Sequence, residues 1–175
     1  MKRKASSAGG SVAAPDGELL IRSRQRTRAV NLRLLREVTL ATLAAQPGVR
    51  SFELGIQLVN ASEMAAVNET FLDHSGSTDV ITFDHSGHAS RNTQHLHGEI
   101  FICLNDAVAQ ARQFRTSWQS ELARYIIHGI LHLRGYDDLT APARRKMKRE
   151  EARLLREIAR QHPLSRLARR ARVAR

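Results

Sequence analysis

The segment from His128 to Asp138, His-Gly-Ile-Leu-His-Leu-Arg-Gly-Tyr-Asp-Asp, constrains this chain more than any other part of the sequence. Apolar residues precede it and run through it at helical spacing, which predicts a helix with a buried face. His128 and His132 are four residues apart, so they lie on the same side of that helix and can point to a common centre. Two imidazoles in this arrangement are a suitable pair of metal ligands.

A third ligand follows the helix. Gly135 can adopt the left-handed conformation that ends a helix, and the chain can then turn back to bring Asp138 close to the histidines. Asp137 is an alternative, but the spacing His-x3-His-x2-Gly-x2-ligand of zinc hydrolases favours Asp138. An isolated pair of histidines is common on surface helices, whereas unpartnered imidazoles on an apolar helix are unfavourable. Two imidazole nitrogens and a carboxylate suit zinc and leave one position for water or substrate. We therefore expect one zinc ion per chain, bound by His128, His132 and Asp138.

The residue after the first histidine argues against one class of zinc enzyme. Zinc peptidases place a glutamate there as general base, and this chain has Gly129. Peptide hydrolysis is therefore disfavoured, and the sequence identifies no other residue as the proton acceptor.

Charge is concentrated at the C-terminal end. The chain has 28 Lys and Arg against 17 Asp and Glu, a net charge of +11. Residues 144–175 hold 13 of the basic and 3 of the acidic side chains, which leaves 15 and 14 for the rest of the chain. Such a segment attracts polyanions such as nucleic acid. The alternative is a solvated basic helix with a disordered end.

Other features bear on where the protein works. The single cysteine, Cys103, lies in an apolar run, so we expect a buried thiol and no intrachain disulfide, as is usual in a reducing cytoplasm. No apolar stretch reaches the roughly 18 residues that a membrane span needs, and the start of the chain lacks the apolar core of a secretory signal. We expect a cytoplasmic protein with no membrane association.

Periodicity and turn residues predict an α+β domain, a small mixed β-sheet of about four strands covered by helices. Strands are expected at residues 17–24, 51–59, 77–83 and 98–104. Helices are expected at residues 32–43, 60–71, 105–115, 117–134 and 140–160, with Asn31 capping the first and Asn60 or Ser62 the second.

Residues 1–17 are expected to be a disordered basic arm, 18–160 a single domain and 161–175 a basic tail. A polar loop is expected at 84–97, and none of its histidines, His85, His88, His95 and His97, is expected to be a primary metal ligand. His97 is the candidate for an exception, because it lies closest to a strand.

The histidine segment closely resembles the signature of the YbeY family, bacterial endoribonucleases of ribosomal RNA maturation. Asn-Glu-Thr-Phe at 68–71, Ser-Thr-Asp-Val-Ile-Thr-Phe at 77–83 and Gly-Glu-Ile-Phe-Ile-Cys at 98–103 resemble other family segments, as do Met147, Glu150 and Glu151. The resemblance covers residues 20–158. It implies a zinc-hydrolase-like metal helix and a single-strand-specific, metal-dependent endoribonuclease. Its implied role is ribosomal RNA processing and ribosome quality control, with ribosomal RNA and the ribosome as partners.

Two positions depart from the family pattern. The third family ligand is histidine, and this chain has Asp138, which zinc also accepts. The family carries an arginine, implicated in RNA cleavage, where this chain has Leu72. Arg134 is the nearest substitute in sequence for that catalytic charge, although it can equally be a solvated residue at a helix end.

Two alternatives remain at this level. Leu72 favours a zinc-stabilised protein that binds RNA or the ribosome with weak or lost catalysis. The second alternative is a zinc-dependent hydrolase of another substrate, such as a peptide, which Gly129 disfavours.

Overall fold

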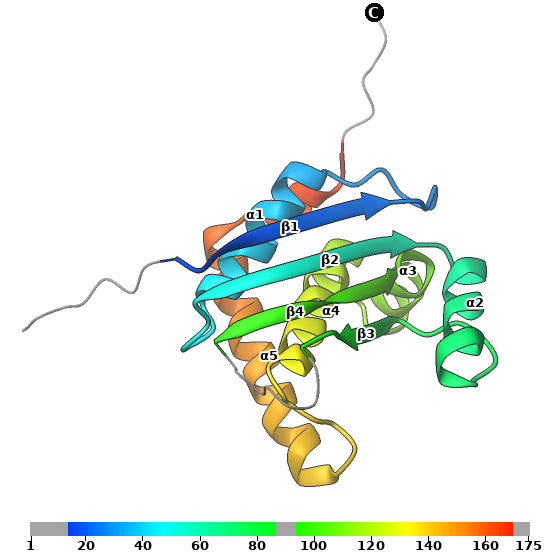
Figure 1. Cartoon of the computed structure of the whole chain (residues 1–175). Coiled ribbons are helices and arrows are strands. Elements are labelled where there is room, and N and C mark those ends of the chain that lie inside the picture. Colours follow the sequence, from blue (N-terminus) through cyan, green and yellow to red (C-terminus); the bar gives the residue numbers. More distant parts are fainter. Residues whose placement is uncertain (1–13, 87–93, 170–175) are drawn as a thin grey trace, which may run out of the picture.

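The computed structural model describes residues 14–86 and 94–169. Its elements occur in the predicted order (Figure 1). They are β1 (Asp16–Ser23), α1 (Leu32–Ala44), β2 (Ser51–Val59), α2 (Ala61–Leu72), β3 (Val80–Asp84), β4 (His95–Cys103), α3 (Leu104–Gln113), α4 (Trp118–Leu133), α5 (Ala141–Gln161) and a short 3-10 helix, η1 (Leu164–Leu167).

The strands form one mixed sheet in the order β1-β2-β4-β3. β2 pairs in parallel with both β1 and β4, and β3 is antiparallel to β4 at the edge. In the register of the central strands, Ile56 lies between Ile21 and Ile100. The predicted fold class, a small mixed sheet with helices, is confirmed.

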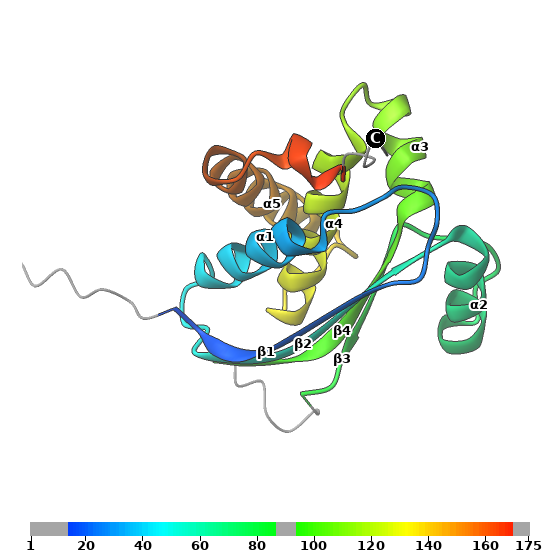
Figure 2. The same ribbon diagram turned by 90° about the horizontal axis from the view of Figure 1, so that it is seen from above.

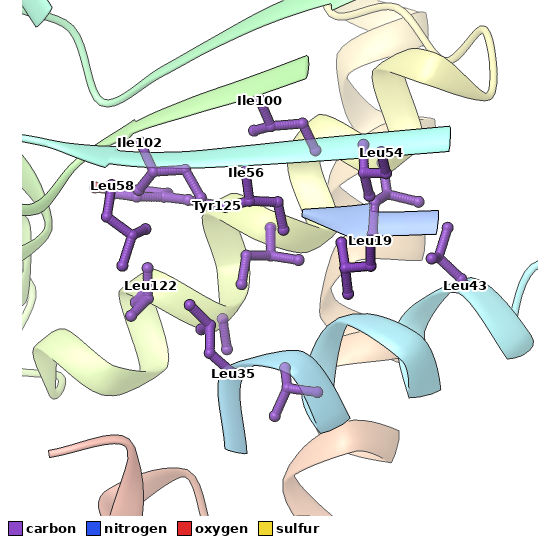
Figure 3. Packing of buried hydrophobic residues seen from close by; sticks show 14 of the residues in the cluster. Leu19, Leu35, Leu43, Leu54, Ile56, Leu58, Ile100, Ile102, Leu122 and Tyr125 are labelled. Carbon is purple, nitrogen blue, oxygen red and sulfur yellow. The ribbon is translucent and has the colours of Figure 1, made fainter. Parts of the chain in front are cut away.

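Helices α1, α4 and α5 lie on the same side of the sheet, and α2 lies at its end (Figures 1 and 2). Alternate residues of the strands face these helices because side chains of a strand point to opposite faces in turn. The core between the layers combines buried side chains of β2, β4, α1 and α4 (Figure 3). Among them are Leu54, Ile56, Ile100, Ile102, Leu35 and Leu122.

Both predicted helix caps are present. The Asn31 side chain accepts a hydrogen bond from the Leu34 amide, and the Asn60 side chain accepts one from the Glu63 amide. Each cap satisfies a backbone donor that the first helical turn leaves without a partner, and contributes about 1 kcal/mol.

Two strand boundaries differ from the prediction. β3 begins at Val80 rather than residue 77, and upstream of it the Ser77 hydroxyl donates to Asp106 on α3. β4 begins at His95, where the Ser51 hydroxyl lies 2.8 Å from Nδ1 of His95. The predicted end of the loop at residue 97 is therefore wrong, because His95 and His97 belong to β4. His88 lies outside the described residues.

The packed part of the chain continues past α5. η1 buries Leu167 completely, the Asn31 amide donates to the Leu167 carbonyl, and Val30 forms a β-bridge with Ala168. Residues up to 169 therefore belong to the packed structure, although 161–175 was expected to be a tail. The arm at 1–17 lies mostly outside the described residues, and its last two positions begin β1. None of the helices in the described ranges has the length and apolar character needed to span a bilayer.

Candidate metal centre

Helix α4 is buried on two sides and carries polar groups on the third. Leu122, Ile126 and Ile130 pack in the core beneath the sheet, and Ile127 and Leu131 pack against α5. The remaining side presents Arg124, His128 and His132, each four residues after the one before. Side chains at this spacing stack along one line of a helix, which brings the two histidines together.

Gly129 explains why no glutamate follows the first histidine. A Cβ atom at this position would lie 2.7 Å from side-chain atoms of Ile100 on β4, closer than real contacts allow. Helix α4 therefore lies against the sheet at a distance that only glycine permits. A side chain here would point into the core rather than toward the histidines, so this position does not supply a general base.

His128, His132 and Asp138 come together in the structure. Each offers a ligand atom, and these atoms all lie within 4.8 Å of one another. Gly135 has φ of +81°, the predicted left-handed conformation, and its amide donates to the His132 carbonyl as the helix ends. This turn brings the Asp138 carboxylate close to the two histidines. Asp137 is not in the cluster, and its side chain instead accepts a hydrogen bond from the Leu139 amide.

The outer nitrogens of both imidazoles have partners. Nδ1 of His128 lies 3.1 Å from a carboxylate oxygen of Glu151, and Nδ1 of His132 lies 3.1 Å from the Tyr136 carbonyl oxygen. Both partners are acceptors, so the neutral tautomers that satisfy them carry hydrogen on Nδ1 and offer a lone pair at Nε2. The two Nε2 atoms lie 3.1 Å apart. Two lone pairs this close repel each other unless a cation lies near them, so the donor set fits a metal ion.

The protonation states also suit a metal. Burial lowers the pKa of His132, the neighbouring His128 lowers it further, and Asp138 opposes this only in part. Burial raises the pKa of Glu151, but hydrogen bonds from His128 and Arg124 outweigh burial and leave this pKa below its ordinary value. At neutral pH His132 is therefore neutral and Glu151 is ionised, as a metal ligand and its supporting carboxylate must be.

Two cavities reach the histidines. The larger one, of about 510 Å³, lies between α3, α4 and α5 and includes His128, Arg124, Tyr125 and Phe114 in its lining. The smaller one, of about 280 Å³, is lined by both histidines and by residues of α2 and β3. His128 therefore lines both cavities, whereas His132 lines the smaller one alone.

The position of the family's arginine faces the smaller cavity. Leu72 lines it together with Thr82 and Asp84, so this chain has an apolar side chain and a carboxylate near the histidines on that side. Arg134 does not replace the missing cation. Its guanidinium donates to the Pro47 carbonyl at 2.7 Å, and the residue lines neither cavity.

Histidines of the described part of the polar loop do not join the cluster. His85 lies 3.8 Å from Glu99, and His97 lies 3.7 Å from Glu53. Neither these two nor His95 contributes to a group with metal-ligand geometry among the described residues.

Sequence reasoning gave no role to two side chains beside the cluster. Glu151 accepts hydrogen bonds from His128 and from Arg124, and Arg124 also pairs with Glu121. The four-residue spacing between Arg124 and His128 does indicate that Arg124 lies on the same side of the helix as the histidines. Glu151 also shares the helical spacing of the apolar Met147 and Leu154, which indicates the buried face of α5 but not the contact with His128.

Comparison with known proteins gives the same family as the motifs. The family model described as "Endoribonuclease YbeY" matches residues 20–159. A protein of Bacteroides thetaiotaomicron named "Endoribonuclease YbeY" is 35% identical over 122 residues, which are 69% of this chain and 85% of that protein. A Legionella pneumophila protein of the same name is 33% identical over 129 residues, 73% of this chain and 82% of that protein.

A solved structure shows the same fold. The solution structure of TM1509 from Thermotoga maritima superposes with a TM-score of 0.61 at 22% identity, covering 90% of this chain and all of that one. At this identity the likeness concerns the fold alone. The family model and the two relatives decide the classification: the chain belongs to the endoribonuclease YbeY family.

Proposed function

We propose that this protein is a zinc-dependent endoribonuclease that cleaves single-stranded regions of ribosomal RNA during ribosome maturation and quality control. The observation that carries the proposal is the cluster of His128, His132 and Asp138, whose first histidine lines two cavities, in a chain of the YbeY family. An endonuclease needs room for its substrate on both sides of the bond that it cleaves, and this arrangement provides it.

The residues of the site have different roles in this proposal. His128, His132 and Asp138 would hold one zinc ion, which when bound lowers the pKa of a water ligand and polarises a phosphate oxygen. Glu151 and the Tyr136 carbonyl fix the orientation of the two imidazoles. Zinc is favoured over magnesium because imidazole nitrogens make up most of the donor set.

The basic face of α5 supports RNA as the substrate. Eight Lys and Arg side chains of this helix are exposed, from Arg144 to Arg160. One of them adjoins the site, because Lys148 lines the larger cavity together with His128. Such cations bind the phosphate backbone without reading the bases, and they position the strand for cleavage.

Among the alternatives, a protein that binds RNA or the ribosome without cleaving is favoured by Leu72 alone. Hydrolysis of a peptide has less support, since Gly129 packs against Ile100 and leaves no place for the general base of a zinc peptidase.

Three measurements test the proposal on one preparation purified without chelators: elemental analysis, cleavage of a ribosomal RNA fragment, and cleavage of an unstructured peptide. We expect about one zinc per chain, cleavage of the RNA and none of the peptide. Intact RNA with one zinc per chain would favour the binding protein. Cleavage in a preparation free of bound metal would overturn the assigned site.

A further inference from the structure

The larger cavity has features that the metal cluster does not use. It lies beside His128 between α3, α4 and α5, and its volume of about 510 Å³ falls in the ~300–1,000 Å³ range of small-molecule sites. Of the three residues of the metal cluster, it includes only His128. Lining side chains that do not support the cluster, such as Gln110, Phe114 and Tyr125, are therefore available for contacts with the part of a substrate next to the metal.

Tyr125, one of the lining residues, has a buried hydroxyl without a hydrogen-bond partner among the described residues. The residue is 4% exposed, and its ring packs in the core near Leu58 and Ile102 (Figure 3). No group of the described residues makes a hydrogen bond to its hydroxyl. Burial, with smaller effects of Asp79 and Glu121, raises the Tyr125 pKa, so the hydroxyl stays protonated. A buried hydroxyl without a partner is unfavourable, and a hydrogen bond to a ligand atom would relieve this.

Phe114 offers an aromatic surface to the same cavity. It follows the last turn of α3 and is 60% exposed, although its ring is among the largest apolar side chains of the protein. An exposed ring that lines a cavity next to the proposed nuclease centre is suited to stacking on a base.

The charges of the cavity argue against phosphate as its main occupant. Three carboxylates, Asp79, Glu121 and Glu151, line it against two cations, Arg124 and Lys148. Arg124 is already engaged by two of those carboxylates. An anion would meet repulsion inside, whereas a neutral heterocycle with hydrogen-bonding edges would meet the Tyr125 hydroxyl and the Gln110 amide.

We propose that this cavity is a nucleobase subsite that receives the base of one nucleotide flanking the scissile phosphate, with Phe114 as its stacking surface and the Tyr125 hydroxyl as a hydrogen-bond partner. The inference rests on the proposed function and adds to it a reason for cleavage at particular positions. Lys148 at the exposed side of the cavity contacts the phosphate of the same nucleotide.

The test is a double-mutant cycle between protein and RNA. The cleavage position of the wild-type protein is mapped on a single-stranded oligoribonucleotide, and each flanking nucleotide is then replaced in turn by an abasic one. At one position we expect kcat/KM to fall about 10–100-fold in the wild type, from the loss of stacking. In Phe114→Ala the same abasic change should have almost no effect. Phe71→Ala is the matched control, because Phe71 is 64% exposed and lines neither cavity, and it should keep the full loss.

A second variant tests the hydroxyl alone. Tyr125→Phe keeps the ring in the core and should lower kcat/KM severalfold on intact RNA but not on the abasic RNA. An equal abasic effect in wild type and Phe114→Ala, or no sensitive position at all, would overturn the subsite. Equilibrium affinities for the same oligonucleotides are measured in parallel. If the wild type cleaves nothing, the proposed function fails, and the pattern of affinities still decides whether Phe114 binds a base.

Discussion

Nδ1 of His128 on α4 and a carboxylate oxygen of Glu151 on α5 lie 3.1 Å apart. Glu151 is 7% exposed and also binds Arg124, so its carboxylate is fixed from two sides. This contact orients the His128 ring with Nε2 toward His132 and Asp138. The geometry of the candidate metal centre therefore depends on the packing of α5 against α4 as well as on the histidine motif itself.

Replacing Glu151 by Gln should weaken zinc binding by about 10–100-fold, the usual effect of losing a carboxylate partner of a metal-bound histidine. Competition with a chromophoric chelator measures this affinity. Glu150→Gln is the matched control, since Glu150 pairs with the exposed Arg153 and should leave the affinity unchanged. Equal affinities in the wild type and both variants would show that the contact with His128 does not support the metal.

Leu72→Arg should raise the single-turnover cleavage rate by at least about tenfold. The side chain lines the cavity that holds both histidines, and a cation there stabilises the charge that develops on the phosphate. RNA affinity should change little, since this interaction forms mainly in the transition state. Leu20→Arg provides the control, because Leu20 on β1 is exposed to a similar extent, 43% against 45%. An equal gain in both variants would indicate general attraction of RNA rather than catalysis.

The exposed cations of α5 should make RNA binding strongly dependent on salt. Changing Arg145, Arg149 and Arg156 together to Gln should reduce the slope of log affinity against log salt by about 2, at ~0.7 per phosphate contact to single strands. The matched control changes Arg22, Arg26 and Arg50, which are exposed outside α5. Equal slopes in both triple variants would show that α5 is only a solvated helix.

A truncation that tests the tail must begin after residue 169. Deletion from residue 163 onward would remove the buried Leu167 and the bridge between Val30 and Ala168, and would thereby destabilise the domain. Removing residues 170–175 takes away three arginines and leaves these contacts intact. The metal content should then stay at the wild-type level.

Cys103 should be unreactive in the folded protein. The residue is completely buried, and burial raises the pKa of its thiol, although the neighbouring Ser77 hydroxyl opposes this in part. A raised pKa means less thiolate at any pH below it, and attack also requires local opening. Alkylation by iodoacetamide at pH 8 should therefore be more than about tenfold slower than in urea. Similar rates in both conditions would show that the thiol is accessible.

The sequence was sufficient for the element order because each helix and strand carried its own local signal. The alternation of β2, the caps at Asn31 and Asn60 and the turn at Gly135 depend on neighbouring residues alone. The histidine spacing likewise placed His128 and His132 together, since four residues make about one helical turn.

Contacts between distant segments could not be predicted from the sequence. The pairing of Glu151 with His128 joins residues 23 apart, and that of Arg134 with Pro47 joins residues 87 apart. The start of β4 at His95 was missed because polar histidines there gave no strand pattern. The close approach of α4 to Ile100 explains Gly129 only when both elements are seen together.

The most direct test of the proposed activity is single-turnover cleavage of a ribosomal RNA fragment by metal-free protein to which zinc is returned in steps. We predict that the cleavage rate rises linearly with added zinc and saturates at one equivalent per chain, while His132→Ala stays at least about a hundredfold slower at every step. Cleavage by the metal-free protein at the saturated rate, or equal rates for wild type and His132→Ala, would contradict it.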